Sequence, residues 1–384
     1  MAFARKHPGW TDEHEQLRRT VRGFVERELE PNINAWEEAG EFPRALYTKA
    51  AELGLLGLGF PEAYGGTPVD AFAQLLITEE LARAGSGGVL ASLMSHGIGL
   101  PPIIALGSDA LKQRIAPAVI AGEQISALAI TEPSGGSDVA RLRTTARREG
   151  DHYIVDGSKT FITSGMRADW ITTAVRTGGP GMQGISLLAI PGDAPGLTRT
   201  KLDKMGWWSS DTATLYFDGC EVPAANLIGP EHGGFMGIMV NFNGERMMLA
   251  ALALGLARVC YDEALAWARE RETFGKPLVR HQVIRHKLVD MATSIRAVEC
   301  VLDDLAWRID RGEVPIPEVC MAKNLATACV ELCAKEAVQI LGGAGFIRGV
   351  KSERIYRETK VLSIGGGAEE IMKELAARQL GYLN

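Results

Sequence analysis

The hydrophobic pattern of this chain changes its period twice, and the order of these changes limits the folds that it can adopt. From Thr11 to about Ala121, apolar residues recur at helical spacing, as in the stripe of Leu17, Val21 and Phe24. Between about Ile125 and Gly229, the pattern changes to short β-type runs. Long helical patterns return afterwards, at 235–269, 282–311, 318–341 and 369–380.

This order predicts an α+β protein with three domains. We expect an N-terminal all-α domain over 1–122, a middle antiparallel β domain over 123–232 and a C-terminal helical bundle over 233–384. Within the β domain, we expect strands at 153–155, 170–175, 185–190 and 215–217. The pairs Gly150-Asp151, Asp156-Gly157 and Asp218-Gly219 are typical of turns between them.

One loop of the predicted β domain has the composition of a ligand-binding segment. An apolar run ends at Ile130 and is followed by Thr131-Glu132-Pro133-Ser134-Gly135-Gly136-Ser137-Asp138. Adjacent glycines let backbone N–H groups approach a ligand, and the hydroxyls of Thr131 and Ser137 can donate hydrogen bonds. By itself the pattern equally fits a strand end followed by an ordinary turn.

Charge, cysteines and histidines exclude several other functions. A net charge of −6 argues against a general nucleic-acid surface. The six cysteines form no C-x-x-C pair, the histidines form no H-E-x-x-H motif, and we predict no metal. No apolar run approaches the ~20 residues of a membrane span. The segment Met1–Pro8 lacks the apolar run of a secretory signal, which predicts a cytoplasmic location.

Further motifs follow the loop in a fixed order, and together with it they resemble the acyl-CoA dehydrogenases over nearly the whole chain. These flavoenzymes desaturate acyl-CoA thioesters between the α and β carbons. The motifs are Phe161-Ile162-Thr163-Ser164-Gly165, Arg271-Glu272-Thr273-Phe274-Gly275, His281-Gln282, Gln339-Ile340-Leu341-Gly342-Gly343 and Ile371-Met372-Lys373-Glu374-Leu375-Ala376-Ala377-Arg378. The resemblance implies the family's fold, in which the C-terminal domain is a four-helix bundle.

The resemblance also implies FAD as cofactor and assigns residues to it in two sets. The first wraps the isoalloxazine ring and contains Leu128, Ile130, Thr131, Gly136, Ser137, Phe161, Ile162 and Thr163. The second reaches FAD bound mainly by a neighbouring subunit and contains Arg271, Phe274, Gln282, Gln339, Gly342 and Gly343. Ala368 and Glu370 are expected to flank the flavin. Simpler interpretations stay open: a solvent-facing strand residue for Thr163, a solvated helix face for Arg271 and a helix C-cap for Gly342-Gly343.

The position of the catalytic base departs from the pattern of many family members. They carry a carboxylate two residues after the isoleucine of the last loop, a position that is Gly366 here. The isovaleryl and long-chain branches instead place the base on an earlier helix, just before an arginine, which corresponds to Glu245-Arg246. Glu245 shares a helical stripe with Phe242 and Leu249, where an ionised carboxylate is costly unless it has a function. We therefore predict Glu245 as the base, and a buried structural ion pair is the alternative role for this residue. Glu369 and Glu370 are rival bases by proximity, but they align with positions that flank the flavin.

The same resemblance assigns the remaining contacts of the substrate. The backbone N–H of Gly366, with the ribityl 2′-hydroxyl of FAD, is expected to stabilise the enolate oxygen. Arg246 is expected either to order the helix of Glu245 or to meet CoA phosphates. Ser137, Phe242 and Gly367 complete the expected substrate contacts.

The predicted function is FAD-dependent α,β-desaturation of an acyl-CoA in fatty-acid or branched-chain acyl catabolism. The resemblance implies an electron-transferring flavoprotein as acceptor and a homotetramer, a dimer of dimers. Two alternatives are a flavin-binding family member with a nucleic-acid-associated role and a flavin oxidase on the same scaffold.

Overall fold

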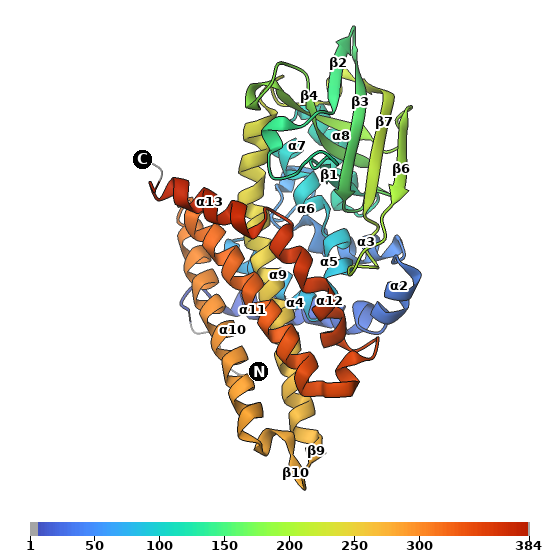
Figure 1. The fold of residues 1–384 in the computed structure, drawn as a ribbon. Helices are drawn as coiled ribbons and strands as arrows, with labels where there is room; N and C mark the ends of the chain where they lie inside the picture. Colours follow the sequence, from blue (N-terminus) through green and yellow to red (C-terminus); the bar gives the residue numbers. More distant parts are fainter. Residues whose placement is uncertain (1–6, 383–384) are drawn as a thin grey trace.

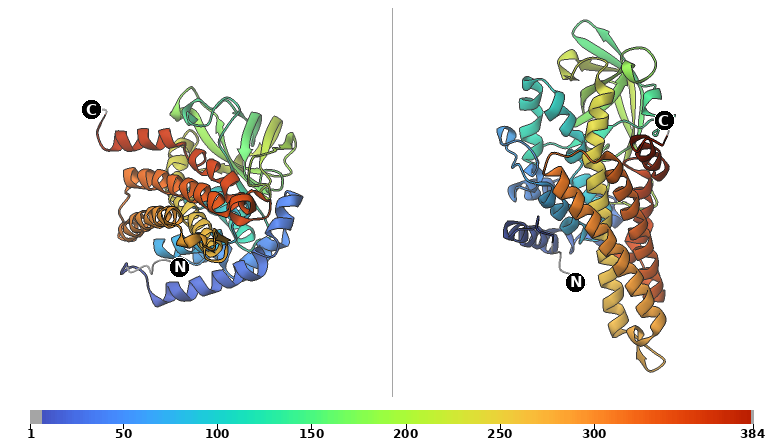
Figure 2. Two further views of the ribbon diagram at one scale, coloured as in Figure 1. Left: turned by 60° about the horizontal axis from the view of Figure 1, so that its bottom comes forward. Right: turned by 90° about the vertical axis from the view of Figure 1, so that its left-hand side faces the viewer.

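The computed structural model describes residues 7–382, without the side chains of residues 240, 241 and 243. A β domain lies at one end, the N-terminal helices pack beside it, and the C-terminal helices extend away from it as a long bundle (Figure 1). The two views of Figure 2 show that one helix, α9, runs from the β domain to the far end of the bundle. The segment Met1–Lys6, used above in the prediction of location, lies outside the described residues.

The N-terminal segment is helical, as its periodicity predicts. Several of its helices begin at a hydroxyl or carboxylate N-cap, and the side chains of Thr11, Asp70, Ser86 and Ser108 each accept a backbone N–H of the first turn. The α-helices are α1 Asp12–Phe24, α2 Ile33–Ala39, α3 Ala45–Glu52, α4 Ala71–Ala82, α5 Gly87–Leu93, α6 His96–Gly99, α7 Pro101–Leu106 and α8 Asp109–Ile120.

The middle segment forms an eight-stranded sheet in the order β6-β7-β3-β2-β4-β5-β8, with β1 paired to β4. Its strands are β1 Ser126–Ala129, β2 Thr145–Glu149, β3 His152–Ile162, β4 Trp170–Arg176, β5 Ile185–Pro191, β6 Leu197–Lys201, β7 Ala213–Pro223 and β8 Leu227–Ile228. The prediction of antiparallel pairing needs one correction. β1 runs parallel to β4 over four residue pairs, and β2 meets β4 in parallel at Thr145 and Arg176.

Two of the three predicted turn pairs lie inside strands. Gly150-Asp151 forms the turn between β2 and β3, but Asp156-Gly157 belongs to β3 and Asp218-Gly219 to β7. The register between these two strands shifts between Val155 and Gly157, where Asp156 of β3 lies opposite two residues of β7, Asp218 and Gly219, and Gly219 has a φ of 57°. A residue inserted at a β-bulge needs such unusual backbone angles, so glycine marks an irregular strand here and not its end.

The C-terminal segment contains α9 Gly234–Glu270, α10 Gln282–Ile309, α11 Ile316–Leu341, α12 Lys351–Ile364 and α13 Glu369–Gln379. A two-stranded hairpin, β9 Glu272–Thr273 and β10 Lys276–Pro277, connects the first two helices. Helix α12 was absent from the predicted helical segments. Arg354 and Glu358 are buried on the inner face of this helix. Because these charged residues interrupt the apolar stripe, the sequence does not show the periodicity of an amphipathic helix there.

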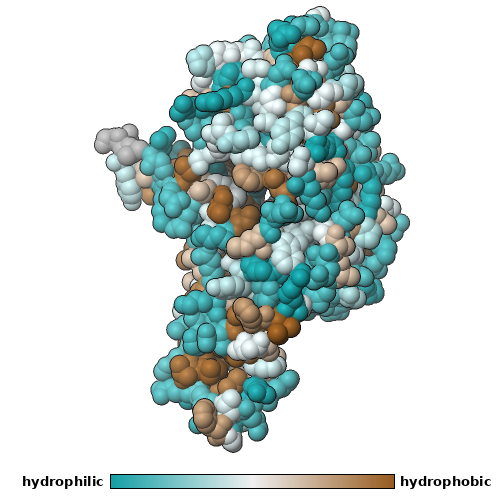
Figure 3. Space-filling view, turned by 45° about the vertical axis from the view of Figure 1, so that its right-hand side comes forward, coloured by the Kyte–Doolittle hydropathy of each residue, from teal (hydrophilic) through white to brown (hydrophobic). Residues whose placement is uncertain are grey.

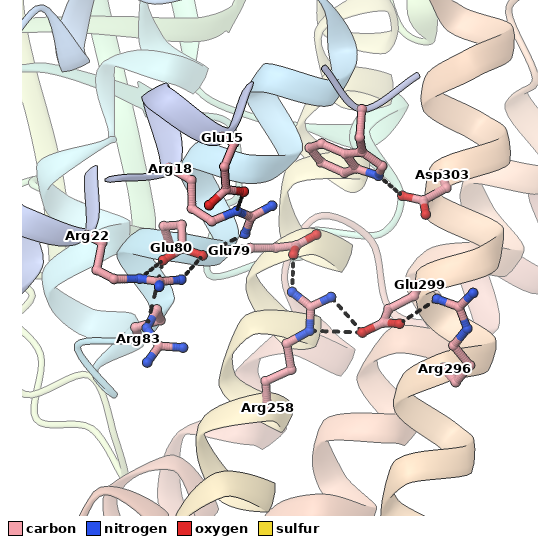
Figure 4. Close-up of polar contacts among 11 residues, drawn as sticks. Glu15, Arg18, Arg22, Glu79, Glu80, Arg83, Arg258, Arg296, Glu299 and Asp303 are labelled. Atoms are coloured by element: carbon pink, nitrogen blue, oxygen red, sulfur yellow. Dashed lines mark hydrogen bonds and ion pairs between the residues drawn. The ribbon is translucent and has the colours of Figure 1, made fainter. Parts of the chain in front are cut away.

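A charged network holds the N-terminal helices against the bundle (Figure 4). The half-buried guanidinium of Arg258, on α9, contacts Glu79 of α4 and lies 2.6 Å from the Oε1 atom of Glu299 on α10. Glu80 accepts hydrogen bonds from two arginines of α1 at 2.8 and 3.0 Å. The network therefore fixes the direction of α9, the helix that carries the predicted base.

Between residues 7 and 382, no single helix is long and apolar enough to cross a membrane. The pair Gly87–Leu93 and His96–Leu106 reaches this length and composition only together, with a bend of 49° between its halves. The predicted domain boundaries stay a prediction, although β1 begins at Ser126 and α9 at Gly234, close to two of them.

Candidate active site

The loop that follows β1 is shaped by the buried carboxylate of Glu132. Its two oxygens accept the backbone N–H groups of Arg143 at 2.6 Å and Thr144 at 2.8 Å. Its Oε1 atom also accepts a hydrogen bond from the Nζ atom of Lys159 at 2.8 Å. The side chains of residues 133–138 are exposed. The loop is thus anchored from inside while its outer face stays open to a ligand.

The ion pair between Lys159 and Glu132 also ties this loop to β3. Lys159 is fully buried and donates a second hydrogen bond to the carbonyl of Ile130 at 3.0 Å. Burial opposes ionisation of Glu132, but Lys159 and the two N–H donors lower its pKa to about 2. Burial also lowers the pKa of Lys159, to about 8. The backbone N–H of Thr160 donates to the carbonyl of Thr131 at 2.8 Å, which places the loop beside the end of β3.

The next residues of the chain, Phe161 to Thr163, therefore lie next to Thr131. Phe161 has a φ of 61° and its ring is 69% exposed, whereas Ile162 is buried and Thr163 half-buried. A large aromatic ring held outward on a strained backbone position is uncommon and points to a functional surface. Figure 3 shows a hollow between the β domain and the helices, with apolar side chains inside it and at its rim.

Glu245 lies on α9 opposite the loop that connects α12 to α13. An atom placed at the Cβ position of Gly366 would be 3.6 Å from the Oε1 atom of Glu245. The two positions at which family members carry the base, residue 245 on α9 and residue 366 in the loop, therefore face each other. The Oε2 atom of Glu245 is buried and has no hydrogen-bond partner among residues 7–382. The structure thus does not show the ion pair that was the alternative for this carboxylate.

Two buried cations hold this loop from two different helices. The Nε atom of Arg246, on α9, donates to the carbonyl of Gly366 at 3.3 Å, and its guanidinium lies over the ring of Phe242. The Nζ atom of Lys323, on α11, donates to the carbonyl of Gly367 at 2.8 Å. Asn324 donates to the carbonyl of Glu369 at 3.0 Å. Arg246 is buried and contacts the loop, which fits the ordering role expected for it.

The environment of Glu245 makes it a weak acid. Burial raises its pKa to about 7, although the positive charges of Arg246 and Lys323 lower it. The carboxyl group is therefore close to half-ionised at neutral pH. A pKa near the working pH is typical of a group that exchanges protons.

The other carboxylates near the loop are differently placed. Glu369 and Glu370 begin α13, where Glu370 is exposed and Glu369 accepts a hydrogen bond from Lys373 at 2.5 Å. That hydrogen bond lowers the pKa of Glu369. Neither carboxylate combines burial with a free oxygen, as Glu245 does.

The predicted cofactor residues fall at two separate places in the chain. The first set lies at the β domain and contains Leu128, Ile130, Thr131, Gly136, Ser137 and Phe161–Thr163. Ala368 is half-buried and directly precedes α13. Arg271 follows α9, Phe274 lies at the tip of the hairpin β9–β10, and Gln282 begins α10, all at the far end of the bundle (Figure 1). Gln339, Gly342 and Gly343 are exposed where α11 ends. The two sets of predicted cofactor residues therefore lie apart in the described part of the chain and do not form one site within it.

Sequence reasoning missed Lys323, Asn324 and the pair of Glu132 with Lys159. Lys323 and Asn324 could have been found, because they are the two polar residues in the segment from Val319 to Ala326, which is otherwise apolar. The Glu132–Lys159 pair could not, since its partners are 27 residues apart and meet only through β1 and β3. Within residues 7–382, no group of three or more His, Cys, Asp or Glu side chains is arranged to hold a metal ion.

Comparison with known protein families agrees with this arrangement along the chain. Residues 11–123 match the acyl-CoA dehydrogenase N-terminal domain, residues 127–220 the middle domain and residues 232–381 the C-terminal domain. The fold and the sequence together define a flavin-dependent oxidoreductase. The chain belongs to the acyl-CoA dehydrogenase family.

Individual relatives cover nearly its whole length. The acyl-CoA dehydrogenase AFT10-1 of Alternaria alternata is 38% identical over 96% of this chain and 92% of its own. The structure of acyl-CoA dehydrogenase from Geobacillus kaustophilus is 37% identical, covers 98% of this chain and 100% of its own, and has a TM-score of 0.94. Glutaryl-CoA dehydrogenase from Mycobacterium smegmatis, in complex with FADH2, is 26% identical and covers 97% and 95%, with a TM-score of 0.92.

These findings confirm the predicted family, three-domain fold, enzyme class and FAD cofactor. They leave the acyl group, the roles of single residues, the oligomeric state and the location as predictions.

Proposed function

We propose that this protein is an acyl-CoA dehydrogenase in which Glu245 removes the α proton of the thioester. The observation that carries this proposal is the buried, unpartnered Oε2 atom of Glu245 opposite Gly366. A buried polar atom without a partner is costly, and such atoms are retained where a ligand completes the hydrogen bond.

The residues present fit FAD. The outer face of loop 133–138 is open, the ring of Phe161 projects beside Thr131, and Thr163 offers a hydroxyl at the same place. These residues would hold the isoalloxazine ring, and Arg271, Gln282 and Gly343 of a second subunit would reach the rest of the cofactor. When bound, FAD accepts the hydride that leaves the β carbon.

The residues of the chain supply the proton transfer and the polarisation. Ionised Glu245 takes the α proton, and its buried surroundings make it a stronger base than an exposed glutamate. The backbone N–H groups of Gly366 and Gly367 donate to no other backbone group among residues 7–382. The N–H of Gly366 is therefore free to donate to the thioester oxygen, where negative charge develops.

Ser137, Phe242, Arg246 and Gly367 are the residues proposed to contact the substrate. Arg246 acts through the carbonyl of Gly366, which it holds, more than through direct contact with CoA phosphates. Gly367 has a φ of 105°, and a side chain there would collide with Met372 at 2.3 Å, so the loop has to be narrow at this point.

The remaining parts of the proposal follow from the family. The enzyme acts in fatty-acid or branched-chain acyl catabolism in the cytoplasm and passes electrons to an electron-transferring flavoprotein. A homotetramer, a dimer of dimers, would bring the two separated sets of cofactor residues together. The nucleic-acid-associated and oxidase alternatives are less well supported, because the net charge is negative and Glu245 retains the geometry of a base.

The experiment is a panel of acyl-CoA thioesters of graded length and branching, mixed anaerobically with the FAD-loaded protein. We expect loss of the oxidised flavin absorbance with at least one member and formation of the corresponding enoyl-CoA. If no thioester reduces the flavin while a small amine or nitro compound does, the oxidase alternative replaces this proposal.

A further inference from the structure

Among residues 7–382, two lysines, Lys159 and Lys323, are fully buried, and their surroundings differ. Lys159 forms an ion pair with Glu132 at 2.8 Å, which compensates the loss of its hydration. Lys323 is equally buried, but among residues 7–382 no carboxylate forms an ion pair with it. Its ammonium donates instead to a neutral group, the carbonyl of Gly367, at 2.8 Å. A buried ammonium without a counter-ion is destabilising, so its retention calls for a function.

The hydrogen bond of Lys323 acts together with that of Arg246 on the loop that faces Glu245. Its hydrogen bond fixes the Gly367 carbonyl, and the bond from Arg246 fixes the preceding carbonyl, that of Gly366. In a trans peptide the N–H points away from the C=O. Holding these two carbonyls toward the helices therefore directs the N–H groups of Gly367 and Ala368 to the opposite side. It fixes the two peptide planes on either side of Gly367, and it restrains Gly366 at its carbonyl.

We propose that Lys323 is a positioning residue for the desaturation reaction: its ammonium holds loop 365–367 against Glu245 and supplies a buried positive charge that favours the ionised carboxylate. This inference rests on the proposed function of Glu245. Within the described part of the chain, Lys323 forms no hydrogen bond or ion pair with Glu245, so it acts through the loop and through its charge.

The electrostatics agree with this geometry. Glu245 experiences the positive charges of Arg246 and Lys323, and both lower its pKa against the effect of burial. Burial and the charge of Arg246 lower the pKa of Lys323 to about 8, although Glu245, Glu369 and Cys320 raise it. Without Lys323, Glu245 stays buried but loses one of the two positive charges that counteract the effect of burial on its pKa. Its carboxyl group would then ionise only at higher pH.

Three substitutions separate charge from hydrogen bonding. Lys323→Arg keeps both, Lys323→Gln keeps a donor without charge, and Lys323→Met removes both. We expect the acid limb of the rate of anaerobic flavin reduction to move upward by about 1 pH unit in Lys323→Gln and Lys323→Met. In Lys323→Arg it should stay within about 0.3 units of the parent. Lys323→Met should also lower the limiting rate about 10-fold relative to Lys323→Gln, because it alone releases the Gly367 carbonyl.

A second readout does not depend on turnover. Infrared difference titration of the protein follows the protonated carboxyl group of Glu245 directly, with Glu245→Gln to identify its band. We expect the midpoint of this band to rise in Lys323→Gln. Asn324→Ala is the matched control, since Asn324 lies next to Lys323 and binds the same loop at Glu369 without charge. Its titration should follow the parent.

The outcomes distinguish a failure of the role proposed for Lys323 from a failure of the proposed function of Glu245. If Glu245→Gln reduces its flavin at the parental rate, the proposed base is wrong. If Glu245→Gln is inactive but both midpoints are unchanged in Lys323→Gln and Lys323→Met, the base stands and the role of Lys323 is refuted. Equal upward shifts in Asn324→Ala would also refute it, because the charge would then not be the cause.

Discussion

A pH dependence near neutrality is the sharpest consequence of the buried carboxylate. Burial raises the pKa of Glu245 to about 7 against the charges of Arg246 and Lys323. Only the ionised group can accept the α proton. About a tenth of the free protein is then competent at pH 6 and about nine tenths at pH 8. The rate should therefore increase about tenfold between these two values.

The assay is anaerobic stopped-flow reduction of the FAD-loaded protein at low acyl-CoA concentration. Under this condition the second-order rate constant reports the ionisation of the free enzyme and not that of the complex. The limiting rate at high acyl-CoA is measured in parallel. Its midpoint belongs to the enzyme–substrate complex.

Two results would refute the reasoning. A flat second-order rate between pH 5.5 and pH 8.5 would show that no group of this kind limits the reaction. A midpoint near the ordinary value of 4.5 would show that the carboxylate is hydrated in solution and that the buried position of Glu245 is not its working position.

Other predictions concern the loops that form the site. In Gly366→Ala, the new Cβ atom would lie 2.3 Å from the Cδ1 atom of Leu249, at a residue whose φ is 65°. We therefore expect the unfolding free energy, measured by denaturant titration, to fall by about 1–2 kcal/mol. Flavin reduction should be at least about 10-fold slower. Lys159→Met leaves Glu132 buried without its cation and should lower the unfolding free energy by about 3–5 kcal/mol, with weaker FAD retention after gel filtration; parental values for both would refute the anchoring role. The pKa of Glu132 is lowered to about 2 in the fold, so its contribution is complete above about pH 4.5 and is lost as the pH falls toward 2. The difference in unfolding free energy between parent and Glu132→Gln should shrink over that interval and stay constant above it.

The fold could be predicted where local pattern and final structure agree. The helical spacing in 235–269 corresponds to α9, Gly234–Glu270, whose segment 250–257 is buried in the core. The prediction failed where tertiary contacts replace the local pattern. Asp218-Gly219 looks like a turn but forms a bulge inside β7. Helix α12 looks polar because Arg354 and Glu358 are buried by partners distant in sequence.

The candidate site shows the same division. Glu245 was found because one carboxylate interrupts an apolar helical face and stands before an arginine. The approach of Glu245 to Gly366 could not be found by pattern alone, since 121 positions separate them and only the packing of α9 against the loop after α12 brings them together. The same holds for Lys323, whose acceptor is a backbone carbonyl and therefore leaves no trace in residue types.

The central claim is that the carboxylate on α9 performs the proton removal that a residue at position 366 would otherwise perform. The most direct test is the rate of anaerobic flavin reduction in Glu245→Gln, which preserves the volume of the side chain and removes its charge. The account predicts a yellow protein with the parental FAD content whose reduction by acyl-CoA is slowed at least about 1,000-fold. Reduction within a few-fold of the parental rate would contradict it.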